Sequence, residues 1–195
     1  MKRKIRISFN APVTLSFALL CMIATILGII SGGRITNALF MTYHSSLLNP
    51  LTYVRFFTYV LGHGGWEHFV GNVSYLLLLG PMLEEKYGSK ILLEIIAITA
   101  LATALVNYVF FWNSALCGAS GVVFAFIILA SFTNYKEGEI PLSFILVFVL
   151  FVGQQVFEGI LVKDNVSQFA HIFGGIVGGC LGYLLNGGRF VKLRT

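Results

Sequence analysis

The chain has 195 residues, of which 57% are hydrophobic and only 11% are charged. Its mean hydropathy is +0.86, and because a soluble domain has about a quarter of its residues charged, a soluble globular domain is excluded. The net charge of +5 does not indicate a nucleic-acid partner, since the basic residues follow a topological pattern instead. We expect one membrane domain over 1–195, with short basic termini at about 1–11 and 187–195.

Six apolar segments approach or exceed the roughly 18–20 residues with which a helix crosses a bilayer. The first follows the basic start MKRKIR, is too long for a signal-peptide core and precedes no recognisable cleavage site. The segment between the first and second spans, 31–65, is aromatic and too polar to cross, so we expect short interfacial helices there. The expected fold is an all-α, polytopic bundle of six transmembrane helices with a long, partly helical first external loop. The predicted spans are 13–30, 66–83, 91–111, 116–132, 140–157 and 169–185.

The lysines and arginines give the expected orientation of these spans. With six spans both termini share one side, and ten of the 13 basic residues lie on that side. The other three are Arg34, Arg55 and Lys163. This excess indicates that both termini are cytoplasmic. The loops at 31–65, 112–115 and 158–168 then face outward, and the even-numbered spans run inward.

Four polar residues lie near the outer starts of the even-numbered spans: His68, Asn72, Ser120 and His171. Polar side chains inside a membrane are costly, so they are candidates for function. His68 and Asn72 are four residues apart and therefore share a helix face. We expect all four side chains at a similar depth below the outer surface.

A glycine face on the sixth span predicts how Ser120 and His171 meet. Below His171, glycine recurs every four residues from Gly174 to Gly182. Such small-residue faces let helix backbones approach closely in lipid. The small residues at 118–121 are the expected partner, and this contact would bring Ser120 within reach of His171.

The predicted pair has the chemistry of a nucleophile with its base. A serine hydroxyl is a weak nucleophile until an adjacent base takes its proton, so we expect Ser120 to attack and His171 to accept the proton. Acyl transfer also needs donors where the oxyanion forms. His68, Asn72 and the backbone N–H of Ser120, at a helix start, are the expected donors.

Other roles for these residues remain open on the sequence alone. Ser120 also suits a simple helix contact, and His171 a hydrogen-bonded histidine inside the bundle. His68 and Asn72 also suit a role in satisfying the backbone of the first loop. We interpret His44 and His63 as interfacial loop residues rather than ligands.

Other hydrolytic chemistries lack their sequence signatures. The pattern H-E-x-x-H of a zinc protease is absent, although His63, Glu67 and His68 are close in sequence. An aspartyl mechanism needs two aspartates, and Asp164 is the chain's one aspartate. The outward-facing acids include no convincing partner for His171, which favours a Ser–His dyad over a triad. The pattern G-x-S-x-G of an α/β-hydrolase is also absent.

Taken together, these residues resemble the rhomboid intramembrane serine proteases in their minimal six-span bacterial form. The motif G-x-S-G is present as GASG (118–121), A-H-x-x-G as AHIFG (170–174) and H-x-x-x-N as HFVGN (68–72). His63 stands at a matching upstream position, and the first-loop element aligns with YVRFFT (53–58). The resemblance covers roughly 51–182.

The resemblance implies a function, a location and a set of supporting residues. It implies cleavage of transmembrane protein substrates near their outer ends, without a cofactor, in a bacterial plasma membrane with the site opening outward. The fifth span and the loop after it are implied to gate the substrate. Gly118, Gly121, Phe124, His63 and Arg55 are the expected supporting residues. The chain has Val54 where the family usually has Trp, and Phe124 where it often has Tyr.

Two other functions compete with proteolysis. A catalytically silent rhomboid-like binder of transmembrane helices is the main alternative, although it has no need of both Ser120 and His171. A small transporter is disfavoured because the polar residues stop in the outer half of the expected bilayer.

Overall fold

The computed structural model describes residues 8–131 and 168–187, together with isolated positions between 142 and 153. This part of the chain is mostly helical, as predicted, with one very short two-stranded sheet. The fifth predicted span and the loop at 158–167 lie outside the continuously described residues. The elements are α1 (Pro12–Ile30), α2 (Arg34–Leu39), β1 (Thr42–Tyr43), α3 (Pro50–Thr58), η1 (Tyr59–Leu61), α4 (Trp66–Tyr87), α5 (Ser89–Phe110), β2 (Ala115–Leu116), α6 (Ser120–Ser131) and α8 (Gln168–Gly187).

The long helices follow the predicted spans closely. Among the described residues, α1 and α5 are long and apolar enough to cross a membrane, while α6 and positions 172–185 of α8 form shorter apolar helices. The helix α4 begins at Trp66 as predicted but continues to Tyr87, beyond the expected end at 83. The first loop contains α2, α3 and η1, which confirms the expected short helices.

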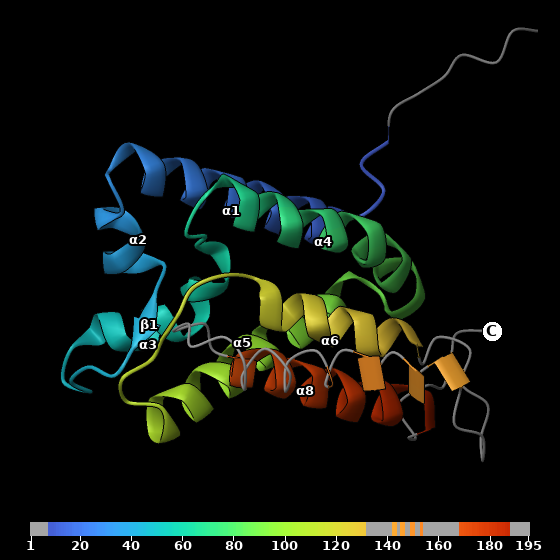
Figure 1. Ribbon diagram of the computed structural model, residues 1–195. Helices are drawn as coiled ribbons and strands as arrows, with labels where there is room; N and C mark the ends of the chain where they lie inside the picture. Colours follow the sequence, from blue (N-terminus) through green and yellow to red (C-terminus); the bar gives the residue numbers. More distant parts are fainter. Residues whose placement is uncertain are drawn as a thin grey trace, which may run out of the picture.

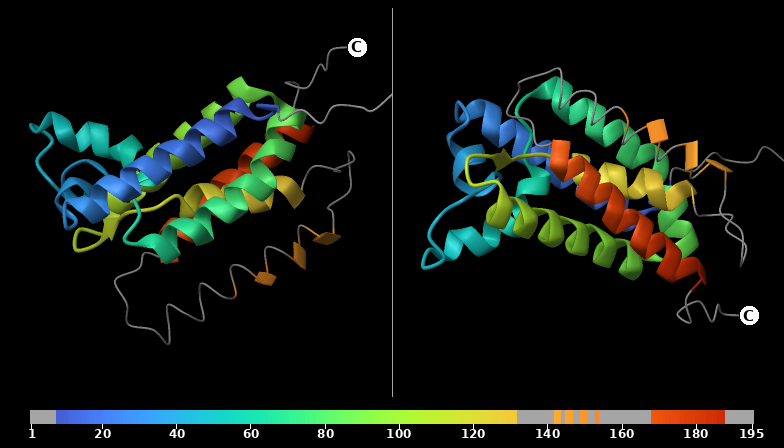
Figure 2. Two further views of the ribbon diagram at one scale, coloured as in Figure 1. Left: turned by 90° about the horizontal axis from the view of Figure 1, so that it is seen from above. Right: turned by 60° about the horizontal axis from the view of Figure 1, so that its bottom comes forward.

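The helices are arranged so that several of their ends meet on one side. In Figures 1 and 2, α1 and α4 lie side by side, as do α6 and α8. The starts of α4, α6 and α8 lie at the end of the molecule that carries α2, β1 and α3 (Figure 1). The chain therefore brings the polar starts of three helices to the same end.

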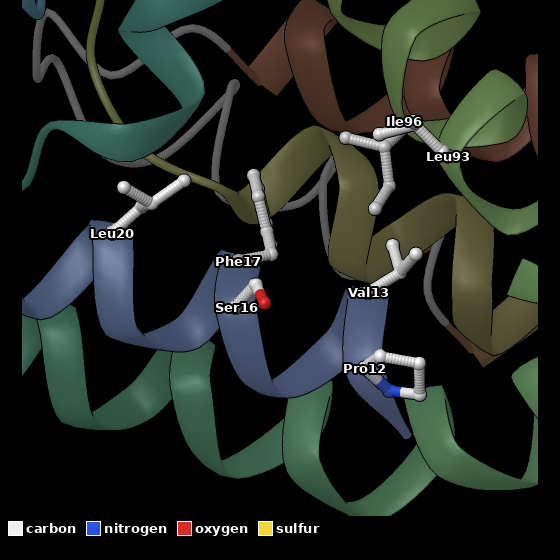
Figure 3. Close-up of a pocket in the computed structure, with 7 residues that line it drawn as sticks. All are labelled: Pro12, Val13, Ser16, Phe17, Leu20, Leu93 and Ile96. Atoms are coloured by element: carbon white, nitrogen blue, oxygen red, sulfur yellow. The ribbon is translucent and has the colours of Figure 1, made fainter.

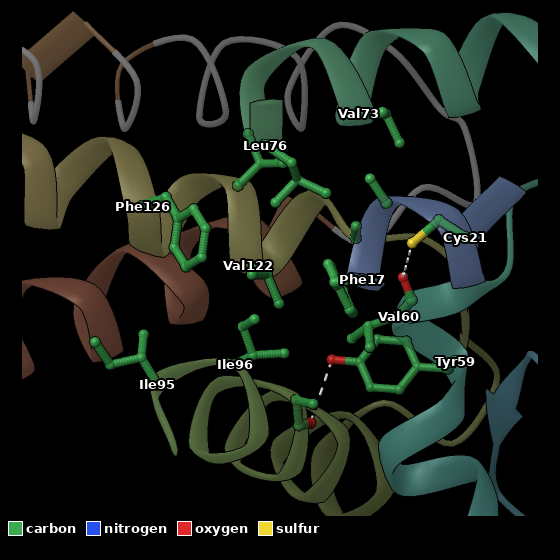
Figure 4. Packing of buried hydrophobic residues seen from close by; sticks show 14 of the residues in the cluster. Phe17, Cys21, Tyr59, Val60, Val73, Leu76, Ile95, Ile96, Val122 and Phe126 are labelled. Carbon is green, nitrogen blue, oxygen red and sulfur yellow. Dashed lines mark hydrogen bonds between the residues drawn. The ribbon is translucent and has the colours of Figure 1, made fainter. Parts of the chain in front are cut away.

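The core holds the first loop against the long helices. Buried apolar side chains from α1, α4, α5 and α6 form one cluster with Tyr59 and Val60 of η1 (Figure 4). The Tyr59 hydroxyl donates to the Ala100 carbonyl at 3.2 Å, and the Cys21 thiol lies 3.7 Å from the Val60 carbonyl oxygen. These bonds connect η1 to both α5 and α1, so the segment preceding α4 has a fixed place.

Glu84 ties the other end of the bundle together. Its carboxylate accepts from the backbone N–H groups of Val13 and Thr14, each at 2.9 Å, and from the Thr14 hydroxyl at 2.8 Å. It also accepts from the Ser89 hydroxyl at 2.7 Å. The first N–H groups of a helix lack partners within the helix, so Glu84 caps α1 from α4 and holds the start of α5.

The start of the fourth span differs from the prediction. We expected helix from 116, but Leu116 belongs to β2, and α6 begins at Ser120. In the two-stranded sheet, Thr42 pairs with Leu116 and Tyr43 with Ala115. The first loop therefore holds the segment that leads into α6 in an extended form.

Candidate functional site

The turn before α6 places Ser120 as the first residue of that helix. Gly118 has φ +128°, a conformation that residues with a side chain rarely adopt. Its N–H donates to the Tyr59 carbonyl at 3.0 Å, and the helical bonding begins with Val123 N–H to Ala119 O at 2.9 Å. The N–H of Ser120 is thus one of the helix-start donors that have no acceptor within the helix.

His68 and Asn72 of α4 surround this turn. A Cβ on Gly118 would lie 2.7 Å from His68 Cε1, 2.8 Å from His68 Nε2 and 3.8 Å from Asn72 Nδ2. Only the absence of a side chain at Gly118 allows this approach. Asn72 is buried, and its Nδ2 also donates to the His68 carbonyl at 3.0 Å. The structure therefore places two side-chain N–H groups beside the turn that ends at Ser120.

The tautomer of His68 follows from its partner. The Gly64 N–H donates to His68 Nδ1 at 3.4 Å. A neutral imidazole carries its hydrogen on one nitrogen only, so Nε2 bears it in the neutral ring. The nitrogen nearest Gly118 is consequently a donor.

The contact between α6 and α8 takes the form that the glycine face predicts. A Cβ on Gly174 would lie 2.2 Å from the Gly121 carbonyl oxygen, and one on Gly178 would lie 2.4 Å from that of Ala125. The two backbones therefore touch without intervening side chains. Because both positions advance by four residues together, the helices run parallel.

This register sets the level of His171, which belongs to α8. His171 precedes Gly174 by three residues, so it lies on the same helix face about one turn earlier. That level matches the start of α6, where Ser120 lies. The side chain of His171 is outside the described part of the structure, and its pairing with Ser120 stays a prediction.

His63 is not the interfacial loop residue that we expected. Its side chain is only 3% exposed and packs against the rings of His68 and Phe69, with centroids 5.1 and 5.6 Å away. The loop folds inward here because η1 is anchored in the core. His44 does lie exposed in the first loop, stacked on Tyr108 and Trp112.

The remaining supporting residues divide into buried and exposed positions. Arg55 is buried, donates from Nε to the Ala38 carbonyl at 2.8 Å and lies over the Tyr43 ring at 4.7 Å. It therefore fixes the loop beside β1. Val54 is 45% exposed, so the position where the family usually has Trp faces outward. Phe124 is half-buried in α6, one turn after Ser120.

Two other places offer poorer chemistry. Burial raises the pKa of the Cys117 thiol to about 11, so this thiol is protonated at neutral pH and is a poor nucleophile. A groove of about 350 Å³ lies between α1 and α5 (Figure 3) and contains Val13, Phe17 and Leu93. Apart from Ser16, the groove is lined by apolar residues. It lies along the first half of α1, whereas Thr25, the α1 residue that faces His63, lies in the second half.

Sequence reasoning missed three contributors to this arrangement. Tyr59 supplies a backbone carbonyl to Gly118, Gly64 supplies an N–H to His68, and Thr25 lies 3.4 Å from His63 Nδ1. The first two act through their backbones, so their side chains carry no signal. Within the described residues, no three His, Cys, Asp or Glu side chains are grouped to hold a metal ion.

These features define a helical membrane protein with polar groups gathered at one end of a tightly packed bundle. The family described as "Rhomboid domain" matches residues 50–187, and the chain belongs to the rhomboid family.

Relatives of this chain occur in animals and bacteria. It is 34% identical over 141 residues to Rhomboid-related protein 1 of Caenorhabditis elegans, covering 67% of this chain and 39% of that protein. It is 33% identical over 159 residues to Rhomboid-related protein 2 of Mus musculus, covering 70% and 52% respectively. It is 30% identical over 135 residues to Rhomboid protease GlpG of Haemophilus influenzae, covering 67% and 68%. The chain thus spans about two fifths to a half of the two animal proteins.

Proposed function

We propose that this protein is an intramembrane serine endopeptidase that cleaves transmembrane proteins near the outer end of their spans. The observation that carries the proposal is the close approach of His68 and Asn72 to Gly118, two residues before Ser120. The backbone contact between Gly174 and Gly121 supports it, because it sets His171 at the level of Ser120. The relative named a rhomboid protease supports the class of reaction.

In the proposed reaction, His171 takes the proton of the Ser120 hydroxyl as the oxygen attacks the scissile carbonyl carbon. The carbonyl oxygen becomes an oxyanion, which accepts hydrogen bonds from His68 Nε2–H, Asn72 Nδ2–H and the Ser120 N–H. The proton passes from His171 to the leaving amine, and an acyl-enzyme forms. Water then attacks the ester with His171 again acting as the base. The acyl–oxygen bond breaks as His171 returns the proton to Ser120, and the amino-terminal fragment leaves with a new carboxylate.

The proposal includes a location and an arrangement in the membrane. We propose six spans in a bacterial plasma membrane, with both termini cytoplasmic and the site opening to the outer side. The uneven distribution of lysine and arginine supports this orientation. The shared end of α4, α6 and α8 supports a site close to one membrane surface.

A cleavage assay in liposomes tests the proposal. The purified chain is combined with a tagged single-span reporter substrate, and the product is mapped by mass spectrometry. Ser120→Ala and His171→Ala should each abolish cleavage, while Ser131→Ala at the far end of α6 should leave it intact. Equal cleavage by wild type and Ser120→Ala contradicts the proposal.

A fluorophosphonate probe separates the protease from the alternative of a silent binder. The probe should label Ser120 in folded wild type and leave Ser120→Ala unlabelled. A folded wild type that binds the reporter helix but takes no label and yields no product is a binder.

A further inference from the structure

His63 is buried at the meeting point of three segments. It stands in the turn between η1 and α4, and its Nδ1 lies 3.2 Å from the Leu61 carbonyl oxygen. The same nitrogen lies 3.4 Å from the hydroxyl of Thr25 on α1. Its ring stands nearly perpendicular to that of His68, with an interplanar angle of 73° and centroids 5.1 Å apart.

The partners of His63 fix its tautomer. A backbone carbonyl only accepts, so Nδ1 carries the hydrogen. The Thr25 hydroxyl donates its own hydrogen to the Cys21 carbonyl at 2.8 Å, and it therefore also faces Nδ1 as an acceptor. Burial lowers the pKa of His63 to about 4, His68 adds to this effect, and the Leu61 carbonyl opposes it. The ring is neutral at pH 7 and carries its hydrogen on Nδ1.

Packing alone does not account for a histidine at this place. The Nε2 atom of His63 is buried and has no partner in the described part of the chain. A buried acceptor without a partner costs about 1–3 kcal/mol, and an apolar ring would fill the same space without that cost. What the imidazole adds is the Nδ1–H bond to Leu61, which fixes the plane of the ring.

The fixed ring and its turn together constrain His68. The ring of His63 borders that of His68, and the next residue, Gly64, gives its N–H to His68 Nδ1. The two histidines therefore carry their hydrogens on opposite nitrogens, His63 on Nδ1 and His68 on Nε2. His68 Nε2 is the nitrogen that lies against Gly118.

We infer that His63 is a positioning residue, which holds the turn at 62–65 and the ring of His68 so that His68 Nε2–H points at the Gly118–Ser120 turn. This inference rests on the proposed function, in which His68 donates to the oxyanion. His63 itself does not contact the substrate. Removing one oxyanion donor costs about 10²–10³-fold in kcat, and we expect a misdirected donor to cost part of that.

The kinetic test compares two changes at His63 in the full chain in liposomes. His63→Phe keeps a ring but loses the N–H, and we expect kcat on the reporter substrate to fall about 10–100-fold, with KM unchanged within about twofold. His63→Asn keeps an N–H near the position of Nδ1 and should recover part of the loss. His44→Phe, in the external stack, is the matched control and should keep wild-type kcat. Wild-type kcat in a folded His63→Phe overturns the inference.

Nitrogen-15 NMR of the histidine rings tests the same point without enzymatic activity. The chain has only four histidines, so single substitutions assign each ring. At pH 7, wild type should show His63 with hydrogen on Nδ1 and His68 with hydrogen on Nε2, and His63→Phe should turn His68 into a mixture of tautomers. A His68 signal that is unchanged in folded His63→Phe overturns positioning. A wild type with the expected tautomers but no cleavage refutes the proposed function instead.

Discussion

The contact between α6 and α8 yields a prediction for which a neighbouring glycine provides a matched control. Gly174→Ala would place a Cβ 2.2 Å from the Gly121 carbonyl oxygen, whereas Gly175→Ala would place one 3.7 Å from the nearest side-chain atom of Ile128. Real Cβ atoms essentially never approach within 3.0 Å, so Gly174→Ala must separate the two helices by about 1 Å. Gly175→Ala requires no movement.

A displacement of about 1 Å in a catalytic arrangement costs on the order of 10²-fold in rate. Because the displaced helices carry Ser120 and His171, we expect Gly174→Ala to lower kcat/KM on the reporter substrate about 100-fold. Gly175→Ala should stay within about threefold of wild type, since its new methyl group makes an ordinary contact.

The assay is initial-rate cleavage in liposomes, with folding of each variant checked by its thermal transition in detergent. A second pair repeats the comparison one turn later, where a Cβ on Gly178 would lie 2.4 Å from the Ala125 carbonyl oxygen and one on Gly179 would lie 3.5 Å from the Ile128 side chain. Equal rates for folded Gly174→Ala and Gly175→Ala would refute the reasoning.

Three further predictions concern Glu84, Gly118 and His63. Glu84→Gln replaces an oxygen that accepts backbone N–H bonds by a donor, so the free energy of unfolding in detergent should fall by about 2–4 kcal/mol. The control Glu85→Gln, at an exposed position, should change it little. Equal free energies of unfolding in the two variants would contradict the capping role. In Gly118→Ala the alanine would have to adopt φ +128°, and its Cβ would lie 2.7 Å from the His68 ring, so cleavage should fall about 100-fold. Gly71→Ala is the control and should cleave normally, because the space around its Cβ is open. The pKa of His63, about 4 in the fold against about 6.5 unfolded, means that the unfolded chain binds more protons between these values. His63 therefore contributes up to about 3 kcal/mol to the free energy of unfolding above about pH 6.5, and this contribution is lost as the pH falls toward 4. In His63→Asn, the free energy of unfolding should therefore depend less on pH between about 4 and 6.5 than in wild type. An equal pH dependence in the two proteins would contradict this prediction.

The helix positions were readable from the sequence where composition and spacing alone decide them. Hydropathy placed α1, α5 and α8 to within a few residues, and the four-residue glycine repeat predicted the contact of α8 with Gly121. Both signals are local to the chain. Reading these signals requires only that the partner helix presents small residues.

The errors came from partners that are far away in the chain. Leu116 looked like the start of an apolar helix, but it pairs with Thr42 in a sheet. Glu84 was not singled out from the sequence, yet it accepts hydrogen bonds from backbone N–H groups 70 and 71 residues earlier. Backbone groups are the same at every position, so no sequence pattern marks them as partners. His63 was misjudged for the same reason, because its burial depends on Thr25 and on η1.

The seam between α6 and α8 also limits where a substrate can go. Backbone lies on backbone from Gly174 and Gly121 to Gly178 and Ala125, which leaves no width for a side chain between the two helices. A transmembrane segment that reaches Ser120 under the proposed function has to arrive by another side of the bundle. The same glycines that set the level of His171 therefore also close this side of the site to a substrate helix.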